Sequence, residues 1–332
     1  SEDWRDMDFP MDFSMKQIEI LEAYKKMGAL STYTCTPYLV GNIPMPGEHV
    51  AWGESSAIVF ANSVLGARTN REGGPSALAA AVTGVVPAYG YHLDCNRKGK
   101  YLIKVEMELK NDTDYAVLGY YAGKIAGRGV PVFEGIKQRP RIESLKALGA
   151  AAASSGAVAL FLIVVVTPEA ATRRGLMEKQ YETAKFGPKE YEATIEKFRL
   201  PGPADLTVIG CPHCSIGELG EIAALLSGKK VKSDVWVCTS RQVKCLADIM
   251  GYTQVIKKAG ARIVCDTCPI LCPTSSKGYR TIATNSAKLA HYAPGLWNAA
   301  TGLAGLYDCV NAATGKTGGE GFCAGLCSRG EK

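Results

Sequence analysis

The sequence predicts an α/β protein with open, mostly parallel sheets, and its second half shows the pattern most clearly. Three short apolar runs, at residues 206–209, 234–237 and 262–264, alternate with helical segments at the spacing of a βαβαβ unit. This spacing predicts a flavodoxin-like unit near residues 205–272. Each run ends in thiols, which are Cys211 and Cys214, then Cys238, then Cys265, Cys268 and Cys272. Because crossovers between parallel strands are right-handed, we expect these thiols to gather at one edge of the sheet.

Three regions are predicted along the chain. The clearest linker, Pro201-Gly202-Pro203, separates an N-terminal α/β region with polar site loops, residues 1–200, from the βαβαβ domain at 204–280. Residues 281–332 are expected to form a C-terminal segment that returns to the site. Within the first region we predict a helix that ends at Gly28 and a strand at 101–107. The charged run 173–199 is predicted to be a solvated helix.

One apolar stretch, residues 148–166, has the length of a possible membrane span. Gly149 and Gly156 interrupt it, and its two halves differ in composition. The alanine-rich half predicts the end of a helix, whereas the β-branched half, residues 161–166, predicts a buried parallel strand. We therefore predict that the protein does not enter a membrane.

Composition narrows the class of partner. The 332 residues are 47% hydrophobic and 21% charged, and the net charge is +6 without any prominent basic run. Nucleic-acid binding is therefore not expected, whereas an anionic small-molecule substrate agrees with the charge. Twelve cysteines accompany only four histidines, and no signal-peptide pattern precedes them. This usage favours a reducing cytoplasm, where cysteine clusters bind metal or catalyse reactions.

A second cluster of polar residues lies between residues 46 and 76. Acid, imidazole, hydroxyl and guanidinium groups are crowded there between apolar runs; they include Glu48, His49, Glu54, Ser55, Ser56, Arg68, Asn70 and Arg71. Polar groups that are buried in this way must find partners or a ligand. The pattern alone is consistent with a binding site or with a self-satisfied network of loops.

The thiols are open to three interpretations. Two C-x-x-C pairs, Cys211/Cys214 and Cys265/Cys268, could hold a structural zinc ion. A thioredoxin-like dithiol fits poorly, because Pro269 follows the second pair directly. Dispersed cysteines could instead hold an iron–sulfur cluster, and three thiolates on a four-iron cluster would leave one iron open to a substrate. Zinc and iron–sulfur both remain compatible with the spacing.

Several motifs resemble one known family. The run GEHVAWGESSAIVFANSVLGARTNREGGPSALAAAVTG, residues 47–84, resembles the large subunit of the aconitase X family. The motifs GCPHCS, CTSRQ, CDTC and TNSAK occur in the order found in that family, and ALGAAAASSGAVALF with TPEA matches its middle segment. The resemblance extends over nearly the whole chain.

This resemblance implies an aconitase-like multi-domain architecture and an iron–sulfur hydro-lyase. The implied cofactor is a [4Fe-4S] cluster with one open iron, held by Cys35, Cys268 and Cys309. The loop form RTNREGGPS resembles the archaeal two-subunit branch of the family. That branch implies dehydration of (R)-5-phosphomevalonate to trans-anhydromevalonate 5-phosphate in the mevalonate pathway of isoprene biosynthesis. A small partner subunit is expected to carry a swivelling domain and the general base.

The resemblance also suggests roles for individual residues. Arg68, Arg71 and Lys288 are candidates for binding carboxylate and phosphate, because guanidinium and ammonium groups suit both anions. We expect the substrate to be oriented by the catalytic candidates Ser55, Ser56, Asn70 and Ser286. Glu48, His49 and Glu54 complete the predicted substrate-binding set.

Two alternative functions stay open. Leu162 and Val165 stand where the family usually has histidine and glycine, so one polar contact of the site is absent from this chain. A non-catalytic, metal-binding subunit is therefore one alternative. Dehydration of cis-3-hydroxy-L-proline, the activity of another branch of the family, is the second.

Overall fold

The computed structural model describes all residues except 1, 2, 6, 8, 172–174, 201, 274–276 and 316–332. Two compact units make up the chain. The first unit contains Ser1–Val40 and Phe198–Lys332, and the second contains Gly41–Lys197. Residues 1–40 thus group with the βαβαβ region rather than with the rest of the predicted region 1–200.

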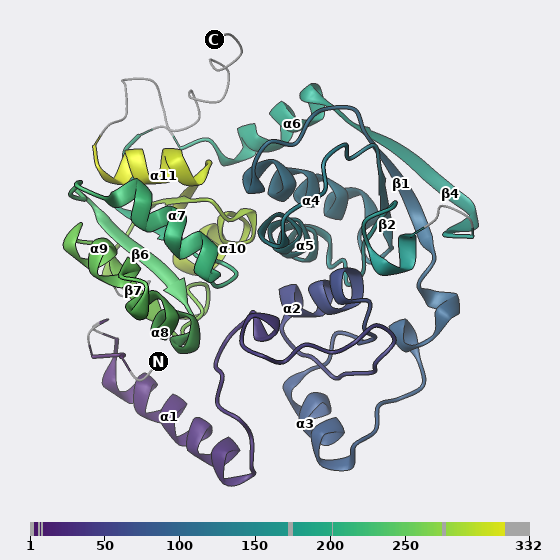
Figure 1. Cartoon of the computed structure of the whole chain (residues 1–332), viewed down its shortest axis with the longest axis horizontal. Coiled ribbons are helices and arrows are strands. Elements are labelled where there is room, and N and C mark those ends of the chain that lie inside the picture. The colour runs from purple at the N-terminus through teal and green to yellow at the C-terminus, as the bar shows by residue number, and fades with distance from the viewer. Residues whose placement is uncertain are drawn as a thin grey trace. The chain divides into compact units, whose positions relative to one another are not determined.

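Five parallel strands form the sheet of the first unit, in the order β7-β6-β5-β8-β9 (Figure 1). The strands are β5 (Leu206–Ile209), β6 (Asp234–Thr239), β7 (Arg262–Cys265), β8 (Thr281–Thr284) and β9 (Ala300–Leu303). The predicted α/β class and the three predicted strands are confirmed. The order is not flavodoxin-like, however, because β6 and β7 continue outward from β5 while β8 and β9 add to its other side. The sequence analysis did not recognise β8 and β9 as strands. It therefore could not predict that the segment after residue 280 pairs with β5 in the same sheet.

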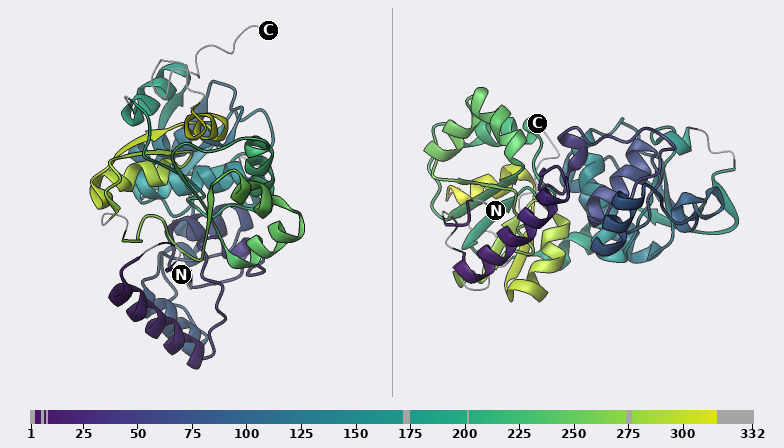
Figure 2. Two further views of the ribbon diagram at one scale, coloured as in Figure 1. Left: turned by 90° about the vertical axis from the view of Figure 1, so that its left-hand side faces the viewer. Right: turned by 90° about the horizontal axis from the view of Figure 1, so that it is seen from below.

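Helices cover both faces of this sheet. One face packs on α7 (Ile216–Leu226), α8 (Arg241–Ile249), α9 (Tyr252–Lys258) and α11 (Leu306–Ala313). The other packs on α10 (Ala287–Trp297) and on Trp4, Met7 and Phe9. The predicted N-terminal helix is α1 (Met11–Lys26), and a 3-10 turn at Pro37–Leu39 follows it. Most of α1 is exposed on the outside of the unit (Figure 2).

The second unit contains a four-stranded parallel sheet in the order β3-β2-β1-β4. Its strands are β1 (Gly99–Val105), β2 (Pro131–Glu134), β3 (Leu162–Ile163) and β4 (Met177–Phe186). The prediction of a helix over 173–199 was wrong for the part that forms β4, and the structure has a helix only at α6 (Pro188–Ile195). Pairing with β1 overrides the helical propensity of the Glu and Lys residues in β4, and the edge position leaves those side chains exposed.

The longest helices of this unit are α4 (Asp112–Ala126) and α5 (Ile142–Gly156), which lie side by side (Figure 1). Glycines allow this contact, since a Cβ on Gly156 would stand 1.7 Å from the Gly123 carbonyl oxygen. The remaining elements are α2 (Ser55–Phe60), α3 (Gly74–Thr83), a π-helical turn at Ala61–Leu65 and 3-10 turns at Gly90–His92, Asp94–Asn96, Pro168–Ala170 and Glu196–Phe198. The polar residues of the 46–76 segment precede α2, lie in its first turn or follow it.

The apolar stretch 148–166 divides as predicted into the end of α5 and the buried strand β3. Leu162 is 1% exposed and packs with Leu102, Val132 and Leu160, so it belongs to the apolar core. Among the described helices, none combines the length and apolar character that crossing a membrane requires.

Val165 holds a backbone conformation that β-branched residues avoid. Its φ is +68°, in the left-handed region, and its side chain is 77% exposed. The left-handed region costs an L-residue about 1–2 kcal/mol, and a branched Cβ adds crowding. Glycine at this position would remove the strain, because it has no Cβ.

Replacing Val165 by glycine is therefore expected to raise the free energy of unfolding by about 1 kcal/mol, after the entropic cost of glycine is deducted. Urea unfolding of wild type and variant measures this. Val166→Gly is the matched control: the same change at a position without positive φ should lower stability. Destabilisation by both substitutions would contradict the assignment of strain to Val165.

Candidate functional site

In the first unit, the direction of strand order changes between β5 and β8. Ligands of open parallel sheets bind outside the carboxyl ends of the strands at such a switch point. Cys211 lies just beyond β5 and Ser286 just beyond β8. The Ser286 hydroxyl caps α10, where it accepts a hydrogen bond from the Leu289 amide, and donates one to the Cys211 carbonyl. Two predicted residues, Ser286 and the buried Lys288, thus lie at the switch point.

Cys211 lies among charged or ionisable neighbours. Burial raises the pKa of its thiol far above the ordinary value. The Lys288 ammonium lowers this pKa, whereas the thiols of Cys268 and Cys35 raise it further. The structure therefore brings the predicted ligands Cys35 and Cys268 together with Lys288 around Cys211. Cys211 is a thiol that the predicted ligand set omitted.

His213 connects the segments that carry these thiols. It is 2% exposed, and its backbone amide donates to the Cys35 sulfur over 3.2 Å. One ring nitrogen, Nδ1, lies 3.0 Å from the Thr34 hydroxyl, and the other, Nε2, lies 3.0 Å from the Thr267 carbonyl oxygen, next to Cys268. The sequence prediction missed this role, although His213 lies within the GCPHCS motif. Its two ring contacts reach chain segments more than fifty residues away.

The third predicted ligand, Cys309, has different surroundings. It lies in α11, is fully buried, and its thiol is 3.7 Å from the Ala304 carbonyl oxygen. The Ala304 amide bonds to the Thr284 carbonyl, so this position follows the carboxyl ends of β8 and β9. Cys309 therefore belongs to the same sheet edge, and its role as a ligand stays a prediction.

The other two thiols of the CDTCPILC segment, Cys265 and Cys272, differ from Cys268 in their surroundings. The pKa of Cys265 is raised to about 12 by burial, and the charged groups that act on it are Asp266, Arg241, Asp3 and Lys244. Cys272 is buried and donates to the Pro269 carbonyl over 3.1 Å. Cys265 and Cys268 thus have separate environments, which disfavours a zinc site made from two C-x-x-C pairs.

The donor set at this edge fits an iron–sulfur group in its chemistry. Soft thiolates are the ligands such clusters require, and the Lys288 ammonium offsets part of their negative charge. Within the described residues, no three His, Cys, Asp or Glu side chains are grouped as the ligands of one metal ion. Cysteines that hold a multi-iron cluster bind different iron atoms, so they need not converge on one point.

In the second unit, Glu54 organises the start of α2. Its carboxylate accepts hydrogen bonds from the Ala57 amide at 2.7 Å and from the Ser56 hydroxyl at 2.6 Å. The Ser55 hydroxyl is 3.4 Å away. The predicted residues Glu54, Ser55 and Ser56 are therefore brought together as a helix cap. Of the three, Ser56 is buried.

Arg68 joins two parts of the polar segment. Its amide donates to the Glu48 carbonyl, and His49 and Arg68 form an isolated bridge. Its guanidinium donates to the His92 carbonyl at 2.9 Å and forms an ion pair with Asp94. The Glu48 carboxylate accepts from the Met45 amide, within its own turn. Arg68 and Glu48 are thus already engaged in holding these loops.

His49 forms a pair with His92, a residue that the sequence prediction did not include. Their Nδ1 atoms are 2.8 Å apart. Such a contact needs one donor and one acceptor, so at least one ring is neutral. His92 is 4% exposed, and its Nε2 has no partner among the described atoms. If the Nδ1 of His92 is the donor, a neutral His92 leaves only a lone pair at the buried Nε2. A cationic His92 would instead bury an unpaired N–H there.

Arg97 holds these loops together through hydrogen bonds of its buried guanidinium group. Its buried guanidinium bonds to the Glu169 carboxylate, with Nε 2.9 Å from both oxygens. The remaining N–H groups donate to the carbonyls of Tyr91, Asn62 and Ala67 and to the Asn62 amide oxygen, at 2.8–3.1 Å. Glu169 is the acid of the TPEA motif, and the structure gives this motif a physical role.

Asn70 and Arg71 differ from each other in their contacts. The Asn70 side chain accepts from the Tyr91 amide at 2.8 Å and donates to the Tyr89 carbonyl at 3.2 Å, so it holds the 89–91 turn. Arg71 is exposed, and no ion pair to it occurs in the described part of the chain. It is therefore available to a ligand.

The buried His92 makes the stability of the second unit depend on pH. Burial, and then the neighbouring His49, lower the pKa of His92 below its ordinary value of 6.5. Below about pH 6.5 the unfolded chain therefore takes up a proton that the folded chain does not, and the free energy of unfolding falls as pH falls. Urea unfolding at about pH 7.5, 6.5 and 5.5 measures this slope. The slope should be shallower in His92→Gln and unchanged in the control His291→Gln; an equal slope in all three proteins would contradict the assignment.

Comparisons with known proteins agree with this architecture. Residues 1–95 match the model of the aconitase X first domain, residues 99–196 the second domain and residues 204–315 the third domain. The matched ranges together span most of the chain.

The chain is 49% identical to the phosphomevalonate dehydratase large subunit of Methanothermobacter thermautotrophicus, over 92% of this chain and 75% of that protein. It is 37% identical to the cis-3-hydroxy-L-proline dehydratase of Pseudomonas aeruginosa, over 97% of this chain and 57% of that protein. The crystal structure of holo aconitase X from Thermococcus kodakaraensis matches with a TM-score of 0.86 and 43% identity, over 92% of this chain and 78% of that one. These matches agree with the two parallel sheets and with the thiols at the edge of one of them. The chain belongs to the aconitase X family.

Proposed function

We propose that this chain is the large subunit of a cytoplasmic phosphomevalonate dehydratase. The reaction is the elimination of water from (R)-5-phosphomevalonate to give trans-anhydromevalonate 5-phosphate, a step of isoprenoid synthesis. The observation that carries the proposal is the gathering of Cys35, Cys268 and Lys288 around Cys211 at the switch point of the first unit, within a family of dehydratases. The net charge of +6 and the unpaired guanidinium of Arg71 support an anionic substrate.

Cys35, Cys268 and Cys309 would hold an iron–sulfur cluster, which we propose to be a [4Fe-4S] cluster with one open iron. When bound, such a cluster supplies a Lewis acid for a hydroxyl that leaves with its electron pair. The buried Lys288 ammonium lowers the pKa of Cys211, the thiol beside the proposed ligands. Ser286 fixes the Cys211 backbone through its hydrogen bond and so sets the shape of the turn beside them.

The residues of the second unit bind and orient the substrate in this proposal. Arg71 binds an anionic group of the substrate through its guanidinium fork. His49, the exposed member of the histidine pair, can donate or accept a proton at its ring. Glu48, Glu54, Ser55, Ser56, Arg68 and Asn70 shape the site, since hydrogen bonds hold each of them to the surrounding loops or helix cap.

A second subunit completes the enzyme in this proposal. Relatives named as large subunits imply a small subunit as the partner. We propose that this partner carries the swivelling domain and the general base. The base removes a proton from the carbon adjacent to the one that bears the departing hydroxyl. The electron pair of the broken C–H bond becomes the new double bond, and the hydroxyl leaves with the pair of the C–O bond. That hydroxyl takes up one proton to become water, and the base releases the proton that it removed, so the net loss is one water molecule.

A second candidate function is dehydration of cis-3-hydroxy-L-proline, which the 37% identity to the Pseudomonas aeruginosa enzyme favours. A third is a non-catalytic metal-binding subunit, because Leu162 is an apolar core residue where the family usually has a histidine. Turnover distinguishes the first two, and binding without turnover would identify the third.

The first test is an assay of the anaerobically prepared complex of this chain with its partner. It should consume (R)-5-phosphomevalonate and leave cis-3-hydroxy-L-proline unchanged, as followed by mass spectrometry of the products. Omission of the partner should abolish turnover, because the general base is then missing. An intact cluster and partner without consumption of 5-phosphomevalonate would contradict the proposed function.

The second test identifies the thiols that hold the cluster. Serine at Cys35, Cys268 or Cys309 should abolish the visible absorbance and lower the iron content. Serine at Cys265 or Cys272 should preserve both, because one lies among charged groups and the other donates to a nearby carbonyl. Cluster loss in Cys265→Ser with retention in Cys35→Ser would contradict the ligand assignment.

A further inference from the structure

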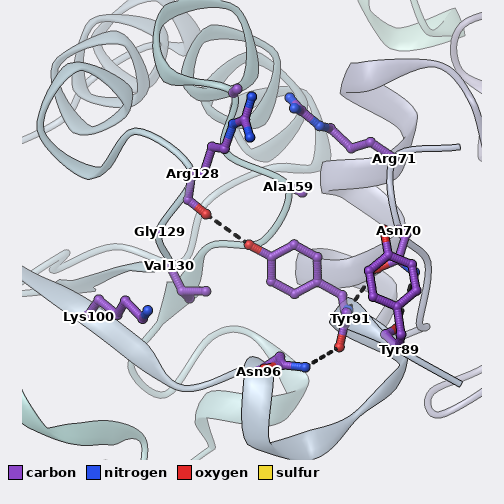
Figure 3. A pocket seen from close by; sticks show the side chains of 12 residues that line it. Asn70, Arg71, Tyr89, Tyr91, Asn96, Lys100, Arg128, Gly129, Val130 and Ala159 are labelled. Atoms are coloured by element: carbon purple, nitrogen blue, oxygen red, sulfur yellow. Dashed lines mark hydrogen bonds between the residues drawn. The ribbon is translucent and has the colours of Figure 1, made fainter. Parts of the chain in front are cut away.

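A pocket of about 400 Å³ lies in the second unit beside the polar segment. Most of its lining comes from the loop at Asn70 and Arg71, the turn 89–91, the start of β1 at Lys100, and the loop 128–130 between α4 and β2 (Figure 3). Ala157 and Ala159 complete the wall with small side chains. The pocket thus continues from the loop that carries two of the predicted site residues.

The charge of this pocket has one sign. Three cations line it, Arg71, Lys100 and Arg128, and the described lining includes no carboxylate. Figure 3 shows the guanidinium groups of Arg71 and Arg128 on the same side of the pocket, turned toward each other. Neither has an ion pair among the described residues, whereas Lys100 has only a long contact of 3.6 Å to Glu178. Two adjacent cations repel, and an anion that binds both reverses that repulsion.

Neutral groups give the pocket a fixed shape. The Tyr91 ring lies in its centre, and the phenol donates to the Arg128 carbonyl at 3.1 Å (Figure 3). The turn before it is held by Asn70 and by Asn96, whose amide donates to the Gly90 carbonyl at 2.9 Å. Gly90 has a φ of +61°, and a Cβ there would stand 2.2 Å from the Asn70 side chain. The pocket is therefore organised before any ligand arrives.

The charge of Arg71 reaches the centre of this pocket. Burial raises the pKa of Tyr91, and the guanidinium groups of Arg71 and Arg97 lower it in part. Because the Tyr91 proton is donated to a carbonyl, its oxygen keeps lone pairs, and the phenol stays neutral. A tetrahedral dianion would therefore meet two guanidinium forks and an ammonium group, which is the chemistry of phosphate recognition.

We propose that this pocket binds the phosphate group of the phosphorylated hydroxy acid, with Arg128 and Lys100 as phosphate-binding residues beside Arg71. This inference rests on the proposed function, because it assigns a binding pocket to the phosphate group of the proposed substrate. That group is remote from the carbons that react. Phosphate recognition here also separates 5-phosphomevalonate from hydroxyproline, which has no phosphate. The specificity of the enzyme then resides partly in Arg128 and Lys100, two residues outside the predicted set.

The experiment uses the anaerobically prepared complex with its partner. Inorganic phosphate is titrated calorimetrically into wild type, Arg128→Gln, Arg71→Gln and the control Arg139→Gln. Arg139 is exposed, lies in the same unit and does not line the pocket. The Arg128 substitution preserves the bond from Tyr91, since that bond uses the backbone carbonyl. We expect phosphate affinity to fall about tenfold or more in both pocket variants and to be unchanged in the control.

Kinetics distinguish the substrate's own phosphate from a separate anion. Inorganic phosphate should compete with 5-phosphomevalonate, and the KM of Arg128→Gln should rise about tenfold with little change in kcat, because binding remote from the chemistry is lost. Phosphate binding that is unchanged in both pocket variants would overturn the proposal, as would non-competitive inhibition. No turnover by the wild-type complex would instead contradict the proposed function, while the calorimetric comparison would still decide whether the pocket binds phosphate.

Discussion

The buried guanidinium of Arg97 is the charge on which the loops of the second unit depend. An arginine with 3% of its surface exposed is stable only if its N–H groups find acceptors in the correct places. Those acceptors are the Glu169 carboxylate and oxygens of Asn62, Ala67 and Tyr91. One side chain therefore fixes the positions of the polar segment, the tyrosine turn and the segment after β3. The histidine pair and the basic pocket are both built on loops that it holds.

His213 has the corresponding place in the first unit, but its contacts are weaker. Hydrogen bonds to hydroxyl and carbonyl groups link it to Thr34 and Thr267, and each contributes about 1 kcal/mol to stability. A paired, buried guanidinium fixes its surroundings more strongly, since loss of one partner costs about 3–5 kcal/mol. The segments that carry Cys35 and Cys268 are therefore linked to each other through His213. In the proposed iron–sulfur site, the two thiols would bind separate iron atoms.

Local patterns predicted those parts of the fold that local sequence determines. The strand β5 and most of β6 are buried on both faces, as is the second half of β7, and all three appear as short apolar runs with regular spacing. The edge strand β4 lacks this signal because it is charged and exposed, and only its pairing with β1 makes it a strand. The strands β8 and β9 each contain only one large apolar side chain, Ile282 and Leu303, so they do not stand out as apolar runs. Strand order could not follow from spacing alone, because either β7 or β8 could have paired with the side of β5 that β6 leaves open.

The candidate site was predictable to the extent that its residues occur in clusters. Polar residues between 46 and 76 and thiols at strand ends were visible as groups, whereas His92, Arg97 and His213 are single residues whose roles come from contacts distant in sequence. Sequence also could not separate a ligand from a structural partner. Arg68 and Arg71 are alike in pattern, yet only Arg68 is paired with an acid in the described structure.

The arginines of the second unit thus divide between folding and binding. A guanidinium that is buried and paired, such as Arg97, cannot turn to a ligand without loss of its partner and a large cost in stability. Exposed and unpaired groups, such as Arg71 and Arg128, bind an anion at the cost of partial desolvation only. Affinity for a phosphorylated substrate can therefore come from residues that contribute little to stability. For this reason substitutions in the basic pocket can change KM without unfolding the protein, and the selectivity of such a site can alter while the fold that Arg97 holds stays the same.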